Sequence, residues 1–182
     1  MKLVAGRADV ADLDGFLDKI GDLETEFDCA IQAFDADYVL GEAHLRTAVE
    51  RADRAFDRGE NIARERAVEI LLYAAGRRQI NRALRMGVGE GESDVVFVVH
   101  SPEGDDDAEE AAAREVRDLL AASSSASQSE TASASTEALA ADRIDREAVM
   151  DFFDVNETEL DATDATLADL VRERVALLDV EK

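Results

Sequence analysis

The segment SDVVFVVHS, Ser93–Ser101, decides the fold because it is the most strand-like stretch of the chain. Its β-branched and aromatic residues favour an extended backbone. Apolar side chains occupy both odd and even positions, which indicates a strand that is buried on both faces. We therefore expect this segment at the centre of a sheet.

The residues before this strand predict further strands and four helices. Expected strands cover Lys2–Ala5, about Phe27–Ala33 and, after a turn at Asp35 and Asp37, Tyr38–Leu40. Expected helices cover Asp9–Ile20, Glu42–Arg58 with Gly59 as its stop signal, a segment capped by Asn61 that reaches about Ala75, and Arg77–Met86. In the last helix, Ile80, Ala83 and Leu84 are expected to face the core.

The residues after the strand predict three helices and a polar insert. A helix is expected over Asp106–Ala121, and ASSSASQSETASAST, 122–136, follows it. This Ser/Ala-rich insert offers nothing large to bury, so we expect a flexible loop. Two amphipathic helices are expected in DREAVMDFFDV, 145–155, and DATLADLVRERVALLDV, 164–180. A chain of this length supports one core, which predicts a single domain over 1–182.

The charge of the chain is unusual. The 182 residues include 43 Asp and Glu and carry a formal net charge of -23, although 46% of them are apolar, as in globular proteins. Lysine occurs 3 times and arginine 17 times. In molar salt the Debye length is about 3 Å, so dense carboxylates repel one another little and keep a protein soluble. The acidity is typical of a halophile and indicates a habitat rather than a partner.

The location of the protein is predicted from what its sequence lacks. No apolar run is long enough for a signal peptide or a membrane span, so we expect a cytoplasmic protein without a membrane partner. The one cysteine, Cys29, lies in the apolar run FDCAIQAF and has no partner for an internal disulfide. We expect it to be a buried thiol.

Catalytic motifs are sparse. The two histidines, His44 and His100, are scattered, and neither belongs to a zinc-binding HExxH arrangement. The run GVGEGES, 87–93, follows a predicted helix and precedes a strand, the reverse of the order in a phosphate-binding loop. DADYVLGE, 35–42, places apolar residues where a calcium loop needs oxygen ligands. The sequence therefore predicts neither an enzyme nor a bound metal or cofactor.

The strongest functional signal is a run without acids over Ile70–Gly89. The segment Glu42–Met86 has ten arginines and seven acids, and the rest of the chain has ten basic and 36 acidic residues. Burial of the apolar residues explains the first part of the run. Arg78, Arg82 and Arg85 follow at helical spacing and predict a solvent-facing stripe opposite Ile80 and Leu84. Either an external anion or acids from other helices would pair with these arginines.

Salt restricts which anion fits. Counterion release, which drives much nucleic-acid binding, weakens in concentrated electrolyte. Arginine still offers bidentate contacts to phosphate and stacks on unpaired bases, and both interactions act at short range. A single-stranded RNA end therefore suits this stripe better than a duplex backbone does.

At this point the sequence resembles a known family. The stretches FDADYVLGEAHL, RGENIA and EILLYAAGRRQI, followed in order by GVGEG and VVFVV, are similar to the small kinase-binding regulatory subunit of the KEOPS complex, the PRPK-binding protein family. The ordered match covers roughly Lys2–His100. With the acidic composition, it suggests a member from a halophilic archaeon.

The resemblance implies a fold and a role. The fold is α+β, with a small mixed or antiparallel central sheet of about three to four strands flanked by helices. The role is that of a non-catalytic subunit that binds and regulates a small atypical kinase. KEOPS makes threonylcarbamoyl-adenosine in tRNA, and its threonylcarbamoyl-transferring subunit is an indirect partner. Family members are also thought to recruit tRNA by its single-stranded CCA end.

The resemblance also suggests site residues. Positions matched to the family's RNA-binding surface are Asn61, Arg64, Arg77, Arg78 and Gln79, whereas Arg82 and Arg85 rest on the helical spacing alone. The kinase-docking surface of relatives involves the C-terminal helices, which suggests Leu170, Val171, Leu177 and Leu178. Each of these four residues could equally complete the core.

Two other functions stay open at this stage. One is a purely structural kinase-docking and activating protein that does not contact RNA. The other is a small enzyme acting on a phosphorylated metabolite through the same arginines, which no candidate general base accompanies.

Overall fold

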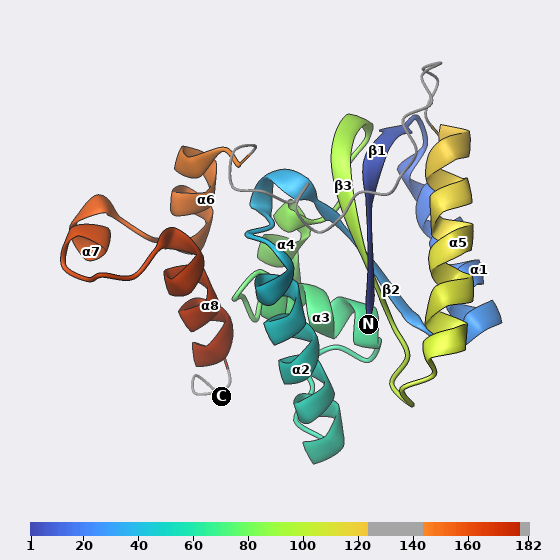
Figure 1. Cartoon of the computed structure of the whole chain (residues 1–182), viewed down its shortest axis with the longest axis horizontal. Coiled ribbons are helices and arrows are strands. Elements are labelled where there is room, and N and C mark those ends of the chain that lie inside the picture. The colour runs from blue at the N-terminus through green and yellow to red at the C-terminus, as the bar shows by residue number, and fades with distance from the viewer. Residues whose placement is uncertain (124–143, 179–182) are drawn as a thin grey trace. The chain divides into compact units, whose positions relative to one another are not determined.

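A computed structural model describes residues 1–123 and 144–178 (Figure 1). The residues divide by their contacts into two compact units. Unit 1 comprises Met1–Ala36 with Gly87–Ala138, and unit 2 comprises Asp37–Met86 with Leu139–Lys182. Whether both units form one domain stays a prediction. The insert at 122–136 lies outside the described residues from 124 onward, and its first two residues end a helix.

Unit 1 is built on an antiparallel sheet. Strands β1 (Lys2–Val10) and β2 (Ala30–Asp35) both pair with β3 (Gly91–His100), so β3 is the central strand. Phe97 lies opposite Val4 on one side and Ala33 on the other. The predicted α+β class, with a small antiparallel sheet, is confirmed.

The central position of β3 follows from its apolar residues. Each residue from Val95 to Val99 is at most 1% exposed, so both faces of the strand are buried as predicted. Val95, Phe97 and Val99 pack in one core with helices α1 (Leu13–Phe27) and α5 (Asp106–Ser123), which cover the same face of the sheet (Figure 1). Burying a side chain as large as Phe97 contributes on the order of 2–3 kcal/mol.

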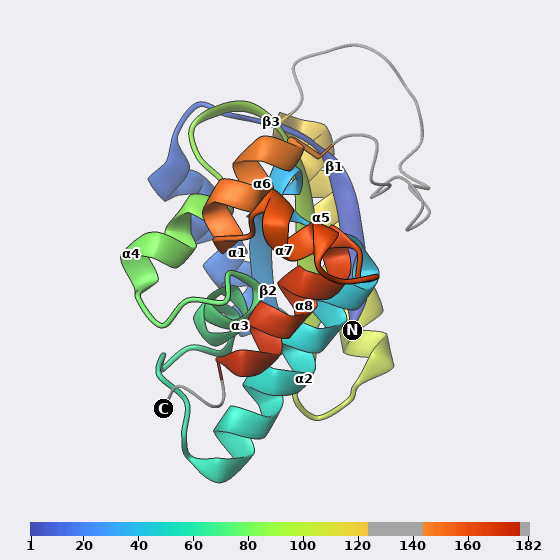
Figure 2. The same cartoon turned by 90° about the vertical axis from the view of Figure 1, so that its left-hand side faces the viewer.

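Unit 2 is helical. Its elements are α2 (Glu42–Arg58), α3 (Arg66–Ala74), α4 (Ile80–Ala83), the 3-10 turn η2 (Leu84–Met86), α6 (Arg146–Phe153), α7 (Glu157–Asp161) and α8 (Leu167–Leu177). Helix α8 packs against α2, α3 and α6 (Figure 2). Helix α2 has the predicted bounds and ends at Gly59, whose φ of 66° is in the left-handed region that glycine adopts without strain.

Two predictions in unit 2 are wrong for local reasons, namely the strand after Asp37 and the start of the helix after Asn61. The strand expected at Tyr38–Leu40 is absent, and the 3-10 turn η1 (Ala36–Tyr38) stands at its start. The Leu40 N–H donates to a side chain in α2, so it is not available to a sheet. Asn61 does not cap the next helix, because α3 begins only at Arg66, with Glu65 as its N-cap.

The predicted helix over Arg77–Met86 is wrong as well. Gly76, with φ 58°, ends the preceding helix, and the chain becomes helical again only at Ile80. Ala83 is buried as predicted, but Ile80 and Leu84 are 44% and 55% exposed rather than buried. Ile80 in α4 and Leu84 in η2 therefore face outward, while Ala83 faces the core.

Candidate functional site

The candidate site begins at the end of α3, where Gly76 sets the direction of the chain. The Gly76 N–H donates to the Tyr73 carbonyl oxygen (2.9 Å) and the Arg77 N–H to that of Leu72 (3.0 Å), which closes the helix. A Cβ at Gly76 would lie 3.4 Å from the Cβ of Arg174 in α8. That distance is an ordinary van der Waals contact, so glycine is favoured here by its φ of 58°, and it places Arg77 directly after a buried helix.

The segment 77–86, here called the arginine segment, is held by a few buried residues. Ala83 and Met86 are fully buried and anchor it to unit 2. Burial of Ile70–Ala75 explains the missing acids in the first half of the acid-free run, as expected. The other side chains of the arginine segment are largely exposed, namely Arg78, Gln79, Ile80, Asn81, Arg82, Leu84 and Arg85.

The arginines of this segment differ in their internal contacts. The side chain of Arg82 makes no hydrogen bond or ion pair with another described residue. Arg85 approaches Asp151 only to 3.9 Å, and both side chains are more than half exposed, so this pair stabilises the fold by at most about 1 kcal/mol. Arg78 has an interaction within the chain. The expected stripe is therefore only partly neutralised from within.

Arg77 makes several contacts within the protein itself. Its Nη2 donates to the Phe152 carbonyl oxygen and to Asp154 Oδ2 (2.8 Å) at the end of α6. Its guanidinium carbon also lies 5.8 Å from the centre of the Phe152 ring, and that of Arg85 lies 5.5 Å from the same ring. Helix α6 thus contributes an aromatic ring and two carboxylates beside the arginines.

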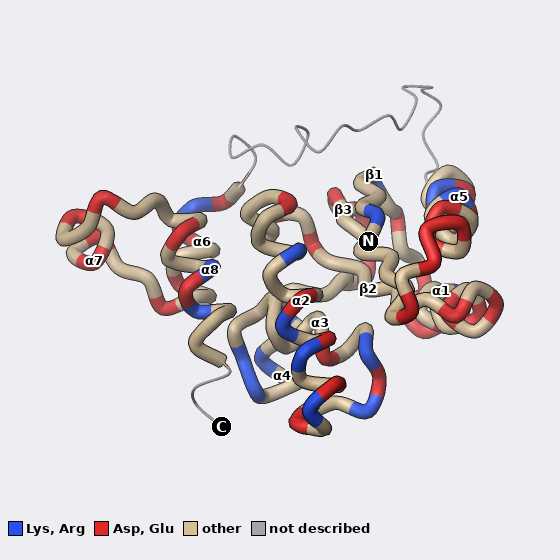
Figure 3. The backbone as a smooth tube through the Cα atoms, turned by 60° about the horizontal axis from the view of Figure 1, so that its bottom comes forward, with Lys and Arg blue, Asp and Glu red and all other residues tan. Residues whose placement is uncertain are grey.

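A second group of suggested RNA-binding residues lies in the loop between α2 and α3. The Asn61 side-chain amide donates to the Ala63 carbonyl oxygen (2.8 Å), so part of its hydrogen-bonding capacity is used within the loop. Arg64 is exposed and makes no contact with the other described residues that would pair its charge. Figure 3 shows Lys and Arg positions along α2, α4 and their adjoining connections, whereas α1 is marked mostly by Asp and Glu.

The suggested kinase-docking residues lie on α8 and just beyond it. Leu170, Val171 and Leu178 are at most 4% exposed, and Leu177 is 39% exposed. Leu177 and Leu178 also line a depression of about 260 Å³ together with Gly76, Arg77, Phe153, Asp154 and Arg174. Of the four residues, only Leu177 presents a large apolar surface, and the other three support the position of α8.

The remaining polar residues with catalytic potential are structural in character. His44 is fully buried; its Nδ1 accepts from the Leu40 N–H (3.2 Å) and its Nε2 lies 2.8 Å from the Ala74 carbonyl oxygen. Burial lowers the pKa of His44 to about 4; the charge of Arg172 lowers it further, and the hydrogen bond to Ala74 opposes the shift. His44 is therefore neutral at neutral pH, with its proton on Nε2.

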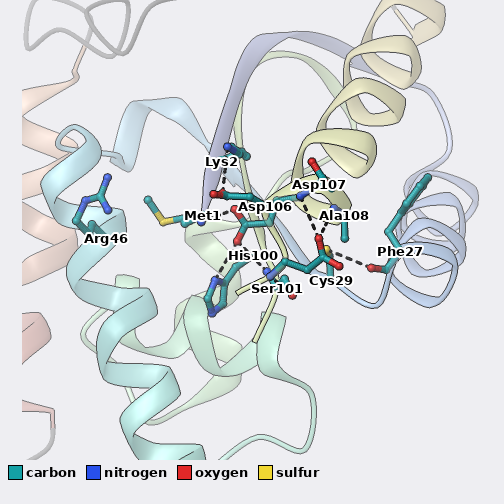
Figure 4. Close-up of polar contacts among 12 residues, drawn as sticks. Met1, Lys2, Phe27, Cys29, Arg46, His100, Ser101, Asp106, Asp107 and Ala108 are labelled. Atoms are coloured by element: carbon teal, nitrogen blue, oxygen red, sulfur yellow. Dashed lines mark hydrogen bonds and ion pairs between the residues drawn. The ribbon is translucent and has the colours of Figure 1, made fainter. Parts of the chain in front are cut away.

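Cys29 and His100 both lie in unit 1 (Figure 4). Burial raises the pKa of the Cys29 thiol, and the carboxylates of Glu109, Asp28 and Asp105 raise it further, so the predicted buried thiol is protonated and unreactive. His100 Nδ1 lies 3.5 Å from Glu109 Oε1, which also accepts from the Ser101 N–H. Within 1–123 and 144–178, no three His, Cys, Asp or Glu residues are placed to hold a metal ion. No helix in these ranges has both the length and the apolarity to cross a membrane.

Sequence reasoning missed three residues of this region. Phe152 and Asp154 of the α6 end contact the arginine segment, and nothing in their spacing indicates which arginine they meet. Glu69 is buried in α3 and binds the loop that carries Asn61 and Arg64. The sequence feature that could have indicated Glu69 is its position as the one acidic residue in the otherwise apolar stretch AVEILLYAA, 67–75.

Comparison with known proteins gives one family. The family model described as Kinase binding protein CGI-121 matches residues 8–179, nearly the whole chain. A search among curated proteins found no match.

Proposed function

Because the chain belongs to the kinase-binding CGI-121 family, we propose that it is a non-catalytic subunit of KEOPS that regulates the small atypical kinase and recruits tRNA by its single-stranded CCA end. Kinase binding is the role that the family description states. The tRNA and the indirect link to the threonylcarbamoyl-transferring subunit are the finer parts of the proposal. Its acid-rich composition fits a halophilic cytoplasm, which would set the salt at which it works.

One observation carries the RNA part of the proposal. Arg82 is exposed and unpaired among the described residues, and Ile80 and Leu84 expose apolar surface in the same short helix and turn. An unstacked base needs an apolar face to pack on, and its phosphate needs a guanidinium nearby. The protein is strongly acidic, yet this segment contains no carboxylates. This contrast favours the binding of an external anionic ligand that has planar apolar faces.

Salt dependence separates this mode of binding from general charge attraction. Few phosphates would be contacted by a short single strand, so the loss of affinity with salt should be shallow. Bidentate arginine contacts and stacking would supply the remaining affinity. We therefore expect tRNA binding to persist in concentrated potassium chloride.

The main test is tRNA binding by the full chain in concentrated potassium chloride. We expect the double substitution Arg78→Glu and Arg82→Glu to weaken binding by at least tenfold, because two short-range contacts of about 1 kcal/mol or more each become repulsive. Intact tRNA should bind, and tRNA without its CCA end should not. A double variant that binds as tightly as the unchanged protein would refute the site.

A matched control uses the same charge change elsewhere in unit 2. Arg54 and Arg58 are exposed on α2, outside the arginine segment. Arg54→Glu with Arg58→Glu should leave tRNA affinity within about twofold, since screening removes their long-range effect in concentrated salt. Equal losses in both double variants would indicate non-specific attraction instead of a defined site.

The second candidate function is a kinase-docking and activating protein that does not contact RNA. The pairing of Arg77 with Asp154 and the proximity of Arg85 to Asp151 favour it, because both arginines then have a structural use. A pull-down with the kinase and a kinase-activity assay, each with the Arg78→Glu and Arg82→Glu variant, distinguish the two functions. Normal kinase activation by a chain that never binds tRNA would establish the second function.

A further inference from the structure

Glu69 is an acidic side chain in an unusual place. It lies in the first half of α3, is fully buried and is followed by residues that are buried as well, from Ile70 to Ala74. Its Oε1 has no hydrogen-bond partner among the described residues. A carboxylate is expensive to bury, so its other oxygen must make contacts that offset the loss of water.

Those contacts come from the loop before the helix. Glu69 Oε2 accepts from the Ile62 N–H (3.0 Å) and from the Ala63 N–H (2.7 Å). The second distance is in the range of charge-assisted hydrogen bonds. The N-cap residue of α3, Glu65, makes no side-chain capping bond, and Glu69 is the acidic residue in the first turn of this helix, near its positive end.

These bonds fix the residues on either side of them. Asn61 precedes the two bonded amides, and its side chain closes back on the Ala63 carbonyl oxygen. Arg64 follows immediately and extends into solvent. The loop contains Gly59 and lies outside any helix, so without Glu69 its backbone would have more conformations available.

We propose that Glu69 is a positioning residue for RNA binding, which holds the loop so that Asn61 and Arg64 are presented in one geometry. The inference rests on the proposed tRNA-binding function. It adds a residue that touches no RNA and acts through two backbone amides. The Glu69 carboxylate is part of the proposed site because it orders the loop that carries Asn61 and Arg64.

The test uses Glu69→Gln in the full chain, with Glu65→Gln as the matched control. Glutamine keeps the size and one carbonyl oxygen but loses the charge that strengthens both bonds. We expect hydrogen exchange at the Ile62 and Ala63 amides to accelerate about tenfold, the factor separating charge-assisted from neutral hydrogen bonds. Affinity for CCA-ended tRNA should fall about three- to tenfold. Glu65→Gln, at an exposed residue of the same loop, should change neither quantity.

A double-mutant cycle excludes a general stability effect. Asn61→Ala with Arg64→Ala removes the groups that Glu69 is proposed to present, so Glu69→Gln should then have no further effect on tRNA affinity. If Glu69→Gln does not fold, Glu69→Asp keeps the charge, shortens the reach, and is measured by the same two quantities.

Each result has a distinct meaning. Unchanged exchange at the two amides in Glu69→Gln overturns the loop-holding role. Faster exchange with unchanged tRNA affinity overturns the link to RNA, while loss of tRNA by the Arg78→Glu and Arg82→Glu variant leaves the proposed function standing. Additive losses in the cycle overturn positioning through the loop. If the unchanged protein does not bind CCA-ended tRNA, both the proposed function and this inference fail.

Discussion

Acidification should destabilise unit 2 through His44. The folded-state pKa of about 4 lies below the ordinary value of 6.5, so the unfolded chain takes up a proton at a higher pH than the folded one. Stability is therefore fully present above pH 6.5 and is lost as the pH falls toward 4. The whole shift corresponds to about 3 kcal/mol, of which about 2 kcal/mol is lost between pH 7 and pH 5.

The structure explains why protonation is unfavourable. Nδ1 of the buried ring accepts a hydrogen bond from the Leu40 N–H. A proton on Nδ1 would remove this hydrogen bond and place two N–H groups against each other. The ring also meets Phe153 edge-on, with ring centres 5.8 Å apart, so water has little access. Removing the imidazole by His44→Gln leaves at least one buried polar group unpaired and should itself cost about 1–3 kcal/mol at pH 7.

The assay is denaturant unfolding at constant high potassium chloride, followed by tyrosine fluorescence. The chain has no tryptophan, and its two tyrosines, Tyr38 and Tyr73, both belong to unit 2. The unchanged protein should lose about 2 kcal/mol more than His44→Gln between pH 7 and pH 5. Equal pH dependence in the unchanged protein and His44→Gln would refute the reasoning.

Three further substitutions test the surroundings of the site. Gly76→Ala should lower the free energy of unfolding by about 1–2 kcal/mol in thermal or denaturant unfolding, because an alanine is strained at φ 58°. Leu177→Asp should weaken kinase capture in a pull-down while leaving the melting temperature nearly unchanged, whereas Val171→Asp, at a fully buried position, should unfold the protein. Asp154→Asn should raise tRNA affinity several-fold in a filter-binding titration, since Arg77 then loses its carboxylate; unchanged or weaker binding would count against a role for Arg77.

Much of the fold could be predicted because the buried positions of several elements carry apolar residues at a regular spacing in the sequence. The residues Val95–Val99 are apolar on both faces, and the strand lies at the centre of the sheet. Helix α2 repeats its apolar residues every three or four positions and stops at a glycine. In both elements the local preference and the tertiary environment agree, which is the condition under which sequence patterns are reliable.

The errors occurred where tertiary contacts override local pattern. Ile80 and Leu84 are apolar and correctly spaced for a buried face, but the left-handed Gly76 breaks the helix, and both side chains are exposed, Ile80 in α4 and Leu84 in η2. Glu69 could not be assigned from sequence, since its partners are two backbone amides that exist only in the folded loop. The kinase-docking and RNA-binding residues remain predictions, because a binding surface is identified by the partner that contacts it.

The single thiol of Cys29 offers an independent view of unit 1. Its side chain belongs to the hydrophobic core of unit 1, is 4% exposed, and has no other cysteine to pair with. A thiol-specific reagent can modify Cys29 only when that core opens. The labelling rate in dilute denaturant therefore measures the opening of unit 1. Because tyrosine emission arises from unit 2, one unmodified protein sample carries a separate reporter for each half of the molecule.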